Sequence, residues 1–148
     1  MTLDASLSVA HWWVVIALVI VLATELARCR GELDHAAVSA LALRDAIYGG
    51  LAVLTLLVGF ARVVYGAKGW DFYAGNPAFW VKIGLFALVG LLSIVPTLRF
   101  MRWRKETAGG AAIDAERTAA TRGWIHVEMA VLMLIPVAAA LMARGIGY

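Results

Sequence analysis

Long apolar segments separated by short polar ones dominate this chain. Four segments carry few charged residues, and each has close to the ~20 residues that an α-helix needs to cross a hydrocarbon core. Their approximate bounds are 7–27, 46–66, 78–101 and 124–143. None alternates between apolar and polar residues as a lipid-facing β-strand does, and a helix satisfies its own backbone hydrogen bonds. The pattern therefore predicts an all-α integral membrane four-helix bundle, formed as one domain over residues 1–148.

The connections between these segments have their own patterns. Residues 29–43 are polar to amphipathic, and we expect them to lie along the membrane surface. Residues 68–77 (KGWDFYAGNP) are rich in turn-forming and aromatic residues, which predicts a short crossing between the second and third spans. In the longest polar connection, Gly109 and Gly110 predict a break, and residues 111–120 are a candidate for a short helix.

The composition supports a membrane location and argues against a nucleic-acid-binding protein. Apolar residues make up 63% of the 148 residues and charged residues only 16%, which leaves too little polar surface for a soluble domain. The net charge is +3, but the basic residues stand at the ends of the segments, which indicates orientation in a membrane. The first segment has neither a preceding basic region nor a cleavage signature, so we expect it to be retained.

Positive charge also predicts the orientation. Basic residues concentrate in the first and third connections: Arg28, Arg30, Arg44, Arg99, Arg102, Arg104, Lys105, Arg117 and Arg122. The positive-inside rule places these connections in the cytoplasm and both termini outside, in a bacterial inner membrane. Six tryptophans lie near the predicted span ends, as interfacial tryptophans do: Trp12, Trp13, Trp70, Trp80, Trp103 and Trp124.

Ionisable residues inside the spans are the main candidates for chemistry, because each costs about 2.5–3.5 kcal/mol at the membrane centre. At 3.6 residues per turn, one side of the second span carries four polar residues: Arg44, Tyr48, Thr55 and Arg62. His11 and Glu25 likewise share a side of the first span. We expect both stripes to face the bundle interior in two layers. The outer layer contains His11, Arg62 and Lys82; the inner layer contains Glu25, Arg44, Asp45, Tyr48, Arg99, His126 and Glu128.

More than one interpretation of these layers is open. Arg44 is expected to meet Glu25 or Glu128, and such an ion pair would serve packing alone. Arg62 and Lys82 lie near enough to the interface for their charges to reach water.

Neither explanation covers His11, which is a candidate metal ligand or proton-transfer group. His126, Met129 and Met133 share a helix side that a soft metal such as Cu(I) could use, although methionine at this spacing usually fills packing gaps. The single cysteine, Cys29, excludes an intrachain disulfide. No phosphate loop, zinc-protease, nucleophile-elbow or dinucleotide motif is present in the sequence.

One long run of residues resembles a known family. The run GFARVVYGAKGWDFYAGNPAFWVKIGLFALVGLLSIVPTLRFMRWRK and the closing ARGIG are similar to bacterial predicted membrane proteins of unknown function. A more distant resemblance is to HemJ-type protoporphyrinogen oxidases and CopD-type copper resistance proteins. In the HemJ-type pattern an early histidine matches His11, a lysine opening the third span matches Lys82, and a tryptophan and glutamate match Trp124 and Glu128 at a changed spacing. Its third-span histidine and tyrosine cluster is replaced here by Pro96 and Thr97.

The leading hypothesis is a bundle that binds haem or a related tetrapyrrole for redox or oxidase-like chemistry, with an unspecified redox partner. His11 is the candidate axial ligand, and Arg62 and Lys82 would hold the propionates. One alternative is a non-catalytic structural or assembly subunit in the lipid bilayer, forming a homodimer through small-residue pairs. Another is a proton or metal conduit that uses Glu25, Tyr48 and Glu128, with Arg44 in the same layer.

Overall fold

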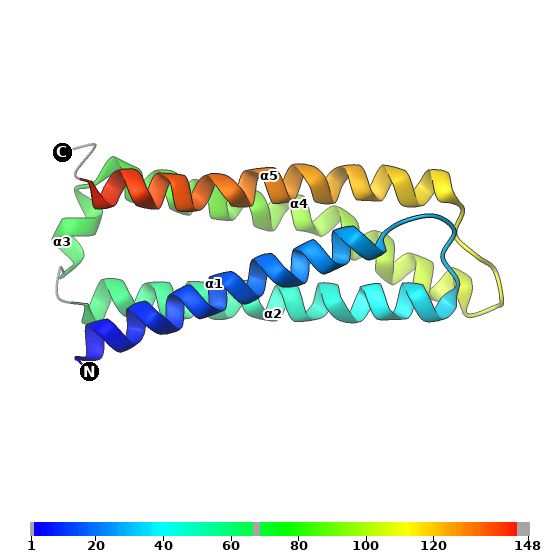
Figure 1. Cartoon of the computed structure of the whole chain (residues 1–148), viewed down its shortest axis with the longest axis horizontal. Coiled ribbons are helices and arrows are strands. Elements are labelled where there is room, and N and C mark those ends of the chain that lie inside the picture. The colour runs from blue at the N-terminus through cyan, green and yellow to red at the C-terminus, as the bar shows by residue number, and fades with distance from the viewer. Residues whose placement is uncertain (1, 67–68, 145–148) are drawn as a thin grey trace.

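The computed structural model describes residues 2–66 and 69–144 and forms a bundle of four long helices with one short crossing helix (Figure 1). The elements in order are α1 (Leu3–Arg28), α2 (His35–Tyr65), α3 (Gly69–Ala74), α4 (Pro77–Thr107) and α5 (Ala115–Ala143). All except α3 are long and apolar enough to cross a membrane. The predicted all-α membrane bundle is therefore confirmed. Lys68 and residues 145–148, which include the end of the ARGIG run, lie outside the described residues.

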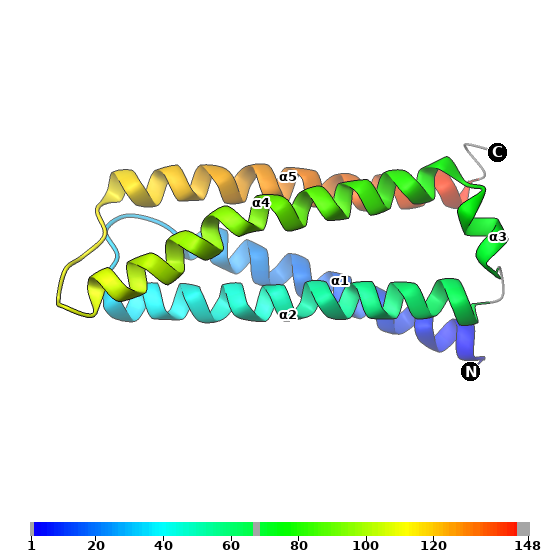
Figure 2. The same cartoon turned by 180° about the vertical axis from the view of Figure 1, so that it is seen from behind.

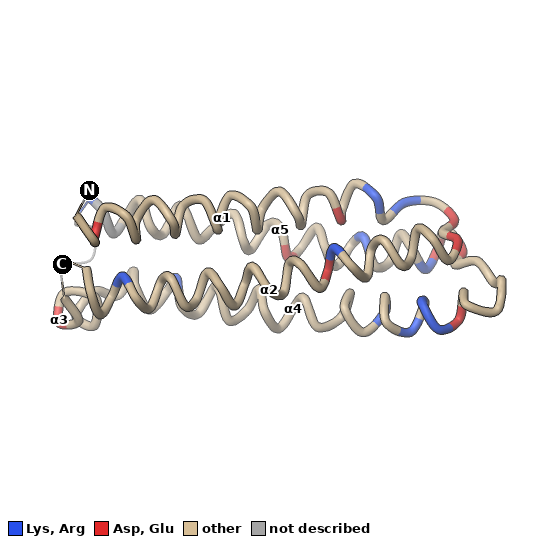
Figure 3. The backbone as a smooth tube through the Cα atoms, turned by 90° about the horizontal axis from the view of Figure 1, so that it is seen from below, with Lys and Arg blue, Asp and Glu red and all other residues tan. Residues whose placement is uncertain are grey.

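The two ends of the bundle differ. The start of α1, the short helix α3 and the last turn of α5 lie at one end, here called the α3 end (Figures 1 and 2). The α1–α2 and α4–α5 connections lie at the other, called the loop end. Figure 3 shows most charged residues in the half of the bundle toward the loop end. The two basic connections therefore share one end.

Local sequence explains where the helices start. Thr2, Asp34, Asn76 and Asp114 each accept a hydrogen bond from a backbone N–H of the first turn that follows, which satisfies a donor that the helix itself leaves free. Pro77 then occupies the first position of α4, where its missing N–H costs nothing. α2 and α4 each have 31 residues, or about 46 Å at 1.5 Å per residue. They are therefore longer than a hydrocarbon core of about 30 Å.

The helices extend into segments that the sequence assigns to connections. The predicted surface segment 29–43 is wrong from His35 onward, because α2 begins there and continues without interruption into the second span. Nothing between Asp34 and the span breaks a helix, so the alanine- and leucine-rich stretch simply prolongs it. The short helix predicted at 111–120 is likewise the beginning of α5, and the crossing at 68–77 contains the short helix α3.

Two helical hairpins, α1–α2 and α4–α5, bury matching positions. In α1 with its C-cap residue and in α4, buried residues correspond in four pairs: Leu18 with Pro96, Leu22 with Phe100, Glu25 with Trp103, and Cys29 with Thr107. In α2 and α5 they correspond in another four: Val38 with Thr118, Leu41 with Thr121, Asp45 with Ile125, and Tyr48 with Glu128. The hairpins are thus approximate copies in packing, although their residues differ.

The two loop-end connections are joined by a backbone bridge. Leu33 and Ile113 exchange both N–H···O hydrogen bonds, each 2.9 Å long, and both side chains are buried. Gly31 and Gly110 precede them with φ of 65° and 90°, which residues with a Cβ rarely adopt. The bridge fixes the α1–α2 connection against the α4–α5 connection.

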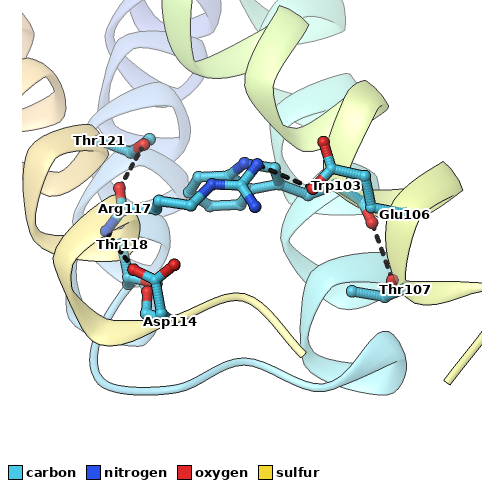
Figure 4. A network of polar contacts seen from close by, with 7 residues as sticks. All are labelled: Trp103, Glu106, Thr107, Asp114, Arg117, Thr118 and Thr121. Atoms are coloured by element: carbon cyan, nitrogen blue, oxygen red, sulfur yellow. Dashed lines mark hydrogen bonds and ion pairs between the residues drawn. The ribbon is translucent and has the colours of Figure 1, made fainter. Parts of the chain in front are cut away.

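A polar network fastens α4 to α5 at the same end (Figure 4). The Arg117 guanidinium forms an ion pair of 2.8 Å with Glu106 and lies 5.7 Å from the centroid of the Trp103 ring. Trp103 is buried, with an exposed fraction of 2%, whereas the other five tryptophans near the predicted span ends have exposed fractions of 39% or more. Its position beneath Arg117 and against Phe100 explains this difference.

Cys29 closes the loop end of α1. Its side chain is fully buried, and its Sγ lies 3.7 Å from the carbonyl oxygen of Thr118. Burial raises the pKa of this thiol from 9.0 to about 11. The thiolate, which is the reactive form, is therefore scarce at neutral pH.

We expect Cys29 in the folded protein to react with a maleimide at least about 100-fold more slowly than an exposed thiol, because its thiolate population is lowered and its Sγ is covered. Arg30→Cys, one residue further and exposed, supplies the matched fast-reacting control in the same chain. Mass spectrometry of the labelled protein counts both sites. Equal labelling rates at the two positions would show that the loop end is open.

Candidate functional site

A cavity of about 680 Å³ opens inside the bundle near the α3 end. All five helices contribute to its wall, which is mainly apolar and aromatic. Trp12 and Phe60 come from α1 and α2, Trp70 and Tyr73 from α3, and Phe79 from α4. We call this space the α3-end cavity. Its volume lies within the range of about 300–1,000 Å³ that is typical of small-molecule and cofactor sites.

His11 reaches the cavity from α1 because the facing position on α2 is a glycine. A Cβ added to Gly59 would lie 3.4 Å from His11 Cε1 and 3.8 Å from Nδ1, so the ring packs directly on the backbone of α2. His11 Nδ1 is buried without a hydrogen-bond partner. The imidazole therefore packs against α2, and its Nδ1 has no hydrogen-bond partner among the described residues.

Two cations share the cavity wall with this imidazole. Arg62 comes from α2 and Lys82 from α4, and both lie near enough to act electrostatically on His11. The Arg62 Nε is buried without a hydrogen-bond partner, and the Lys82 ammonium lies 5.8 Å from the centroid of the Phe79 ring. No Asp or Glu belongs to the part of the wall that the structure describes. The charge of the cavity is thus positive, which suits an anionic group.

A second polar layer lies nearer the loop end. Glu25 of α1, Asp45 of α2 and Glu128 of α5, here called the acidic cluster, are buried with exposed fractions of 1%, 8% and 1%. Asp45 Oδ1 accepts a hydrogen bond of 2.8 Å from Thr97 of α4, so all four long helices meet here. The Tyr48 hydroxyl adjoins the Glu128 carboxylate, but outside normal hydrogen-bond geometry.

The arginines around this layer do not pair with the acidic cluster. The Arg44 guanidinium donates a hydrogen bond of 2.8 Å to the carbonyl oxygen of Ala40, on its own helix. The prediction that Arg44 pairs with Glu25 or Glu128 is therefore wrong. Arg99 of α4 donates a hydrogen bond of 3.1 Å to the Thr121 hydroxyl oxygen. The ion pair between Arg117 and Glu106 lies at the surface, and no ion pair in the described chain reaches the acidic cluster. Structural ion pairing therefore does not explain the buried acids.

An apolar layer separates the two polar ones. Leu18, Leu22, Val89 and Leu132 are buried between them, and Leu18 and Leu132 also form part of the cavity wall. Along α2, Thr55 borders the cavity, and its hydroxyl donates a hydrogen bond of 2.8 Å to the Leu51 carbonyl oxygen. The polar stripe predicted for the second span therefore does face inward, but no continuous polar path joins its two ends in this structure.

The sequence-predicted residues fall into two groups in space. His11, Arg62 and Lys82 line one cavity, whereas Glu25 and Glu128 belong to the acidic cluster and Tyr48 lies beside it. The metal stripe predicted on the fourth span is not assembled: His126 is exposed and its Nδ1 is bonded to the Arg122 carbonyl oxygen, and Met133 is exposed. No group of three or more His, Cys, Asp or Glu in the described chain is close enough to hold a metal ion.

Sequence reasoning missed two residues that shape these sites. Gly59 leaves room for the His11 ring because it has no side chain. A glycine within an apolar span is the feature of the sequence that could have indicated this close contact. Thr97 is the partner of Asp45, and no spacing rule connects α4 with α2, so this contact required the structure.

Comparison with known proteins gives a family and no activity. The chain matches, over residues 3–147, the model of a family described as "Predicted membrane protein (DUF2214)". No curated protein and no solved structure matches the chain, so these comparisons do not extend to HemJ-type or CopD-type proteins. Because the family model covers nearly the whole chain, the protein belongs to the DUF2214 family of predicted membrane proteins.

Proposed function

We propose that the α3-end cavity binds haem or a related anionic tetrapyrrole, with His11 as the axial ligand. One observation carries this proposal: one imidazole and two cations line the cavity together, with no Asp or Glu beside them in the described wall. A tetrapyrrole presents the complementary chemistry, an apolar aromatic ring system with carboxylates at one edge.

Each part of the cavity fits one part of such a ligand. The aromatic and aliphatic wall suits the macrocycle. Arg62 and Lys82 suit the propionates, because guanidinium and ammonium groups form charge-assisted hydrogen bonds with carboxylates. The buried Arg62 Nε, which has no hydrogen-bond partner among the described residues, is a donor for that contact. When bound, haem would supply redox chemistry at its iron, and the residues of this chain would bind and orient it.

We also propose that the protein lies in a bacterial inner membrane with its loop end in the cytoplasm. The loop end carries most of the Lys and Arg residues of the described chain (Figure 3), and positively charged connections favour the cytoplasmic side. The α3-end cavity would then lie toward the opposite face of the membrane. Its cations would stand near the lipid headgroups, where the carboxylates of an amphipathic ligand also remain.

Purified protein, supplied with haem during expression or afterwards, is expected to show a Soret absorption band. His11→Ala should abolish or displace this band, because it removes the only imidazole in the described part of the cavity wall. His126→Ala is the matched control, since His126 is exposed and lies outside the cavity. A wild-type protein without a Soret band after haem addition would refute the proposal, and an unchanged band in His11→Ala would exclude His11 as the ligand.

The size of the cavity can be tested with glycine substitutions. Gly59→Leu is expected to lower haem binding more than tenfold, because its side chain would enter the space beside His11. Gly84→Leu on α4 is the control, since a Cβ there meets nothing within 4 Å and Gly84 is exposed. Titration with haem followed by absorption measures both. Equal affinity in the two variants would place the ligand outside this cavity.

A further inference from the structure

The acidic cluster is not used by the proposed ligand site. None of its three carboxylates belongs to the cavity wall, and each is at least nine-tenths buried. They come from three different helices, α1, α2 and α5, and therefore meet only because the bundle folds. A buried carboxylate normally has a cation or several hydrogen-bond donors beside it.

Such partners are mostly lacking here. Asp45 has one donor, the Thr97 hydroxyl. Glu25 Oε2 and both carboxylate oxygens of Glu128 are buried with no hydrogen-bond partner. No ion pair reaches any of the three acids in the described chain. Three negative charges in this setting would repel each other as well as lack solvation.

The surroundings of the acidic cluster are closed on both sides. Toward the α3 end stands the apolar layer that separates it from the cavity, which includes Leu22 and Val89. Toward the loop end stands Cys29, which is fully buried, and Phe100 and Trp103 belong to the same buried core with exposed fractions of 2% or less. An occupant that neutralises the acids must therefore be small.

We propose that Glu25, Asp45 and Glu128 form an occluded proton-binding site in which the buried glutamates hold protons at neutral pH. A proton fits where a metal ion does not, since no three metal-binding groups of the described residues converge closely enough. A protonated glutamate is also a hydrogen-bond donor, and among the described residues the cluster otherwise has one such donor, the Thr97 hydroxyl.

The charged and titratable neighbours allow such a site to release as well as hold protons. They come from every helix around it: Glu25 and the Cys29 thiol on α1; Arg44, Asp45 and Tyr48 on α2; Arg99 on α4; Arg122 and Glu128 on α5. Arg44 is bonded only to a backbone carbonyl of its own helix, and the Arg122 Nε is buried without a partner. The Arg44 guanidinium, which acts electrostatically on Glu25, is thus placed to neutralise that glutamate when it loses its proton.

Infrared difference spectroscopy of the full-length protein in lipid nanodiscs tests this site directly. At neutral pH we expect the C=O band of a protonated carboxylic acid, which shifts in D₂O and shifts again when glutamate is labelled with ¹³C. Glu128→Gln or Glu25→Gln should remove about half of the band. Glu106→Gln, at the surface ion pair, is the matched control and should leave it intact. Absence of the band in wild-type protein, or its persistence at full intensity in both Gln variants, would overturn the proposal.

A second measurement separates a proton from a metal ion and does not depend on the variants folding. If protons neutralise the cluster, the unfolding temperature of wild-type protein at neutral pH should be the same in NaCl as in an equal concentration of choline chloride. It should also be unchanged by added MgCl₂. A stabilisation that saturates with Na⁺ or Mg²⁺ would instead identify a metal-ion site and overturn the proposal. Haem binding involves none of these residues, so failure of the cavity proposal leaves both results interpretable.

Discussion

The lipid environment is the constraint on which this structure depends. Hydrocarbon solvates apolar side chains as well as a protein interior does, so burial no longer selects for apolar residues, while polar side chains are costly on the lipid-facing surface and gather inside the bundle. α2 shows the result: Leu57 and Phe60 have exposed fractions of 62% and 65%, whereas Tyr48 and Thr55 have 3% and 6%. The bundle is therefore apolar outside and contains two polar layers. Those layers are the natural places to look for function, because maintaining them costs stability.

The buried polar residues are distributed unequally between the two hairpins. Matching positions are buried in both, yet the α1–α2 hairpin carries Glu25 and Asp45 where the α4–α5 hairpin carries Trp103 and Ile125. Tyr48 and Glu128, which adjoin each other, occupy equivalent positions in the two halves. A nearly symmetric frame thus holds an asymmetric set of polar groups. This arrangement positions side chains from distant parts of the chain with only short connections between helices.

The amino-acid sequence was sufficient for the spans and for the side of each helix that faces inward. Both follow from segment length and the 3.6-residue period, as the inward-facing stripe from Tyr48 to Thr55 illustrates. It was insufficient where a choice depends on the neighbouring helix. The sequence allows Arg44 to pair with an acid or with its own backbone. In the folded bundle it donates its hydrogen bond to the carbonyl oxygen of Ala40. The segment after Asp34 fits a surface helix or the start of a span equally well, and Trp103 is buried because Arg117 folds over it.

Site-directed spin labelling tests the central claim, that apolar faces meet lipid and polar stripes face inward. Labels at Leu57 and Leu91, with exposed fractions of 62% and 64%, should collide readily with dissolved oxygen and poorly with a water-soluble nickel chelate. A label at Thr55, on the inward side of α2, should show a markedly lower oxygen collision rate. Equal oxygen accessibility at Leu57 and Thr55, or high nickel accessibility at Leu57 and Leu91, would contradict this account.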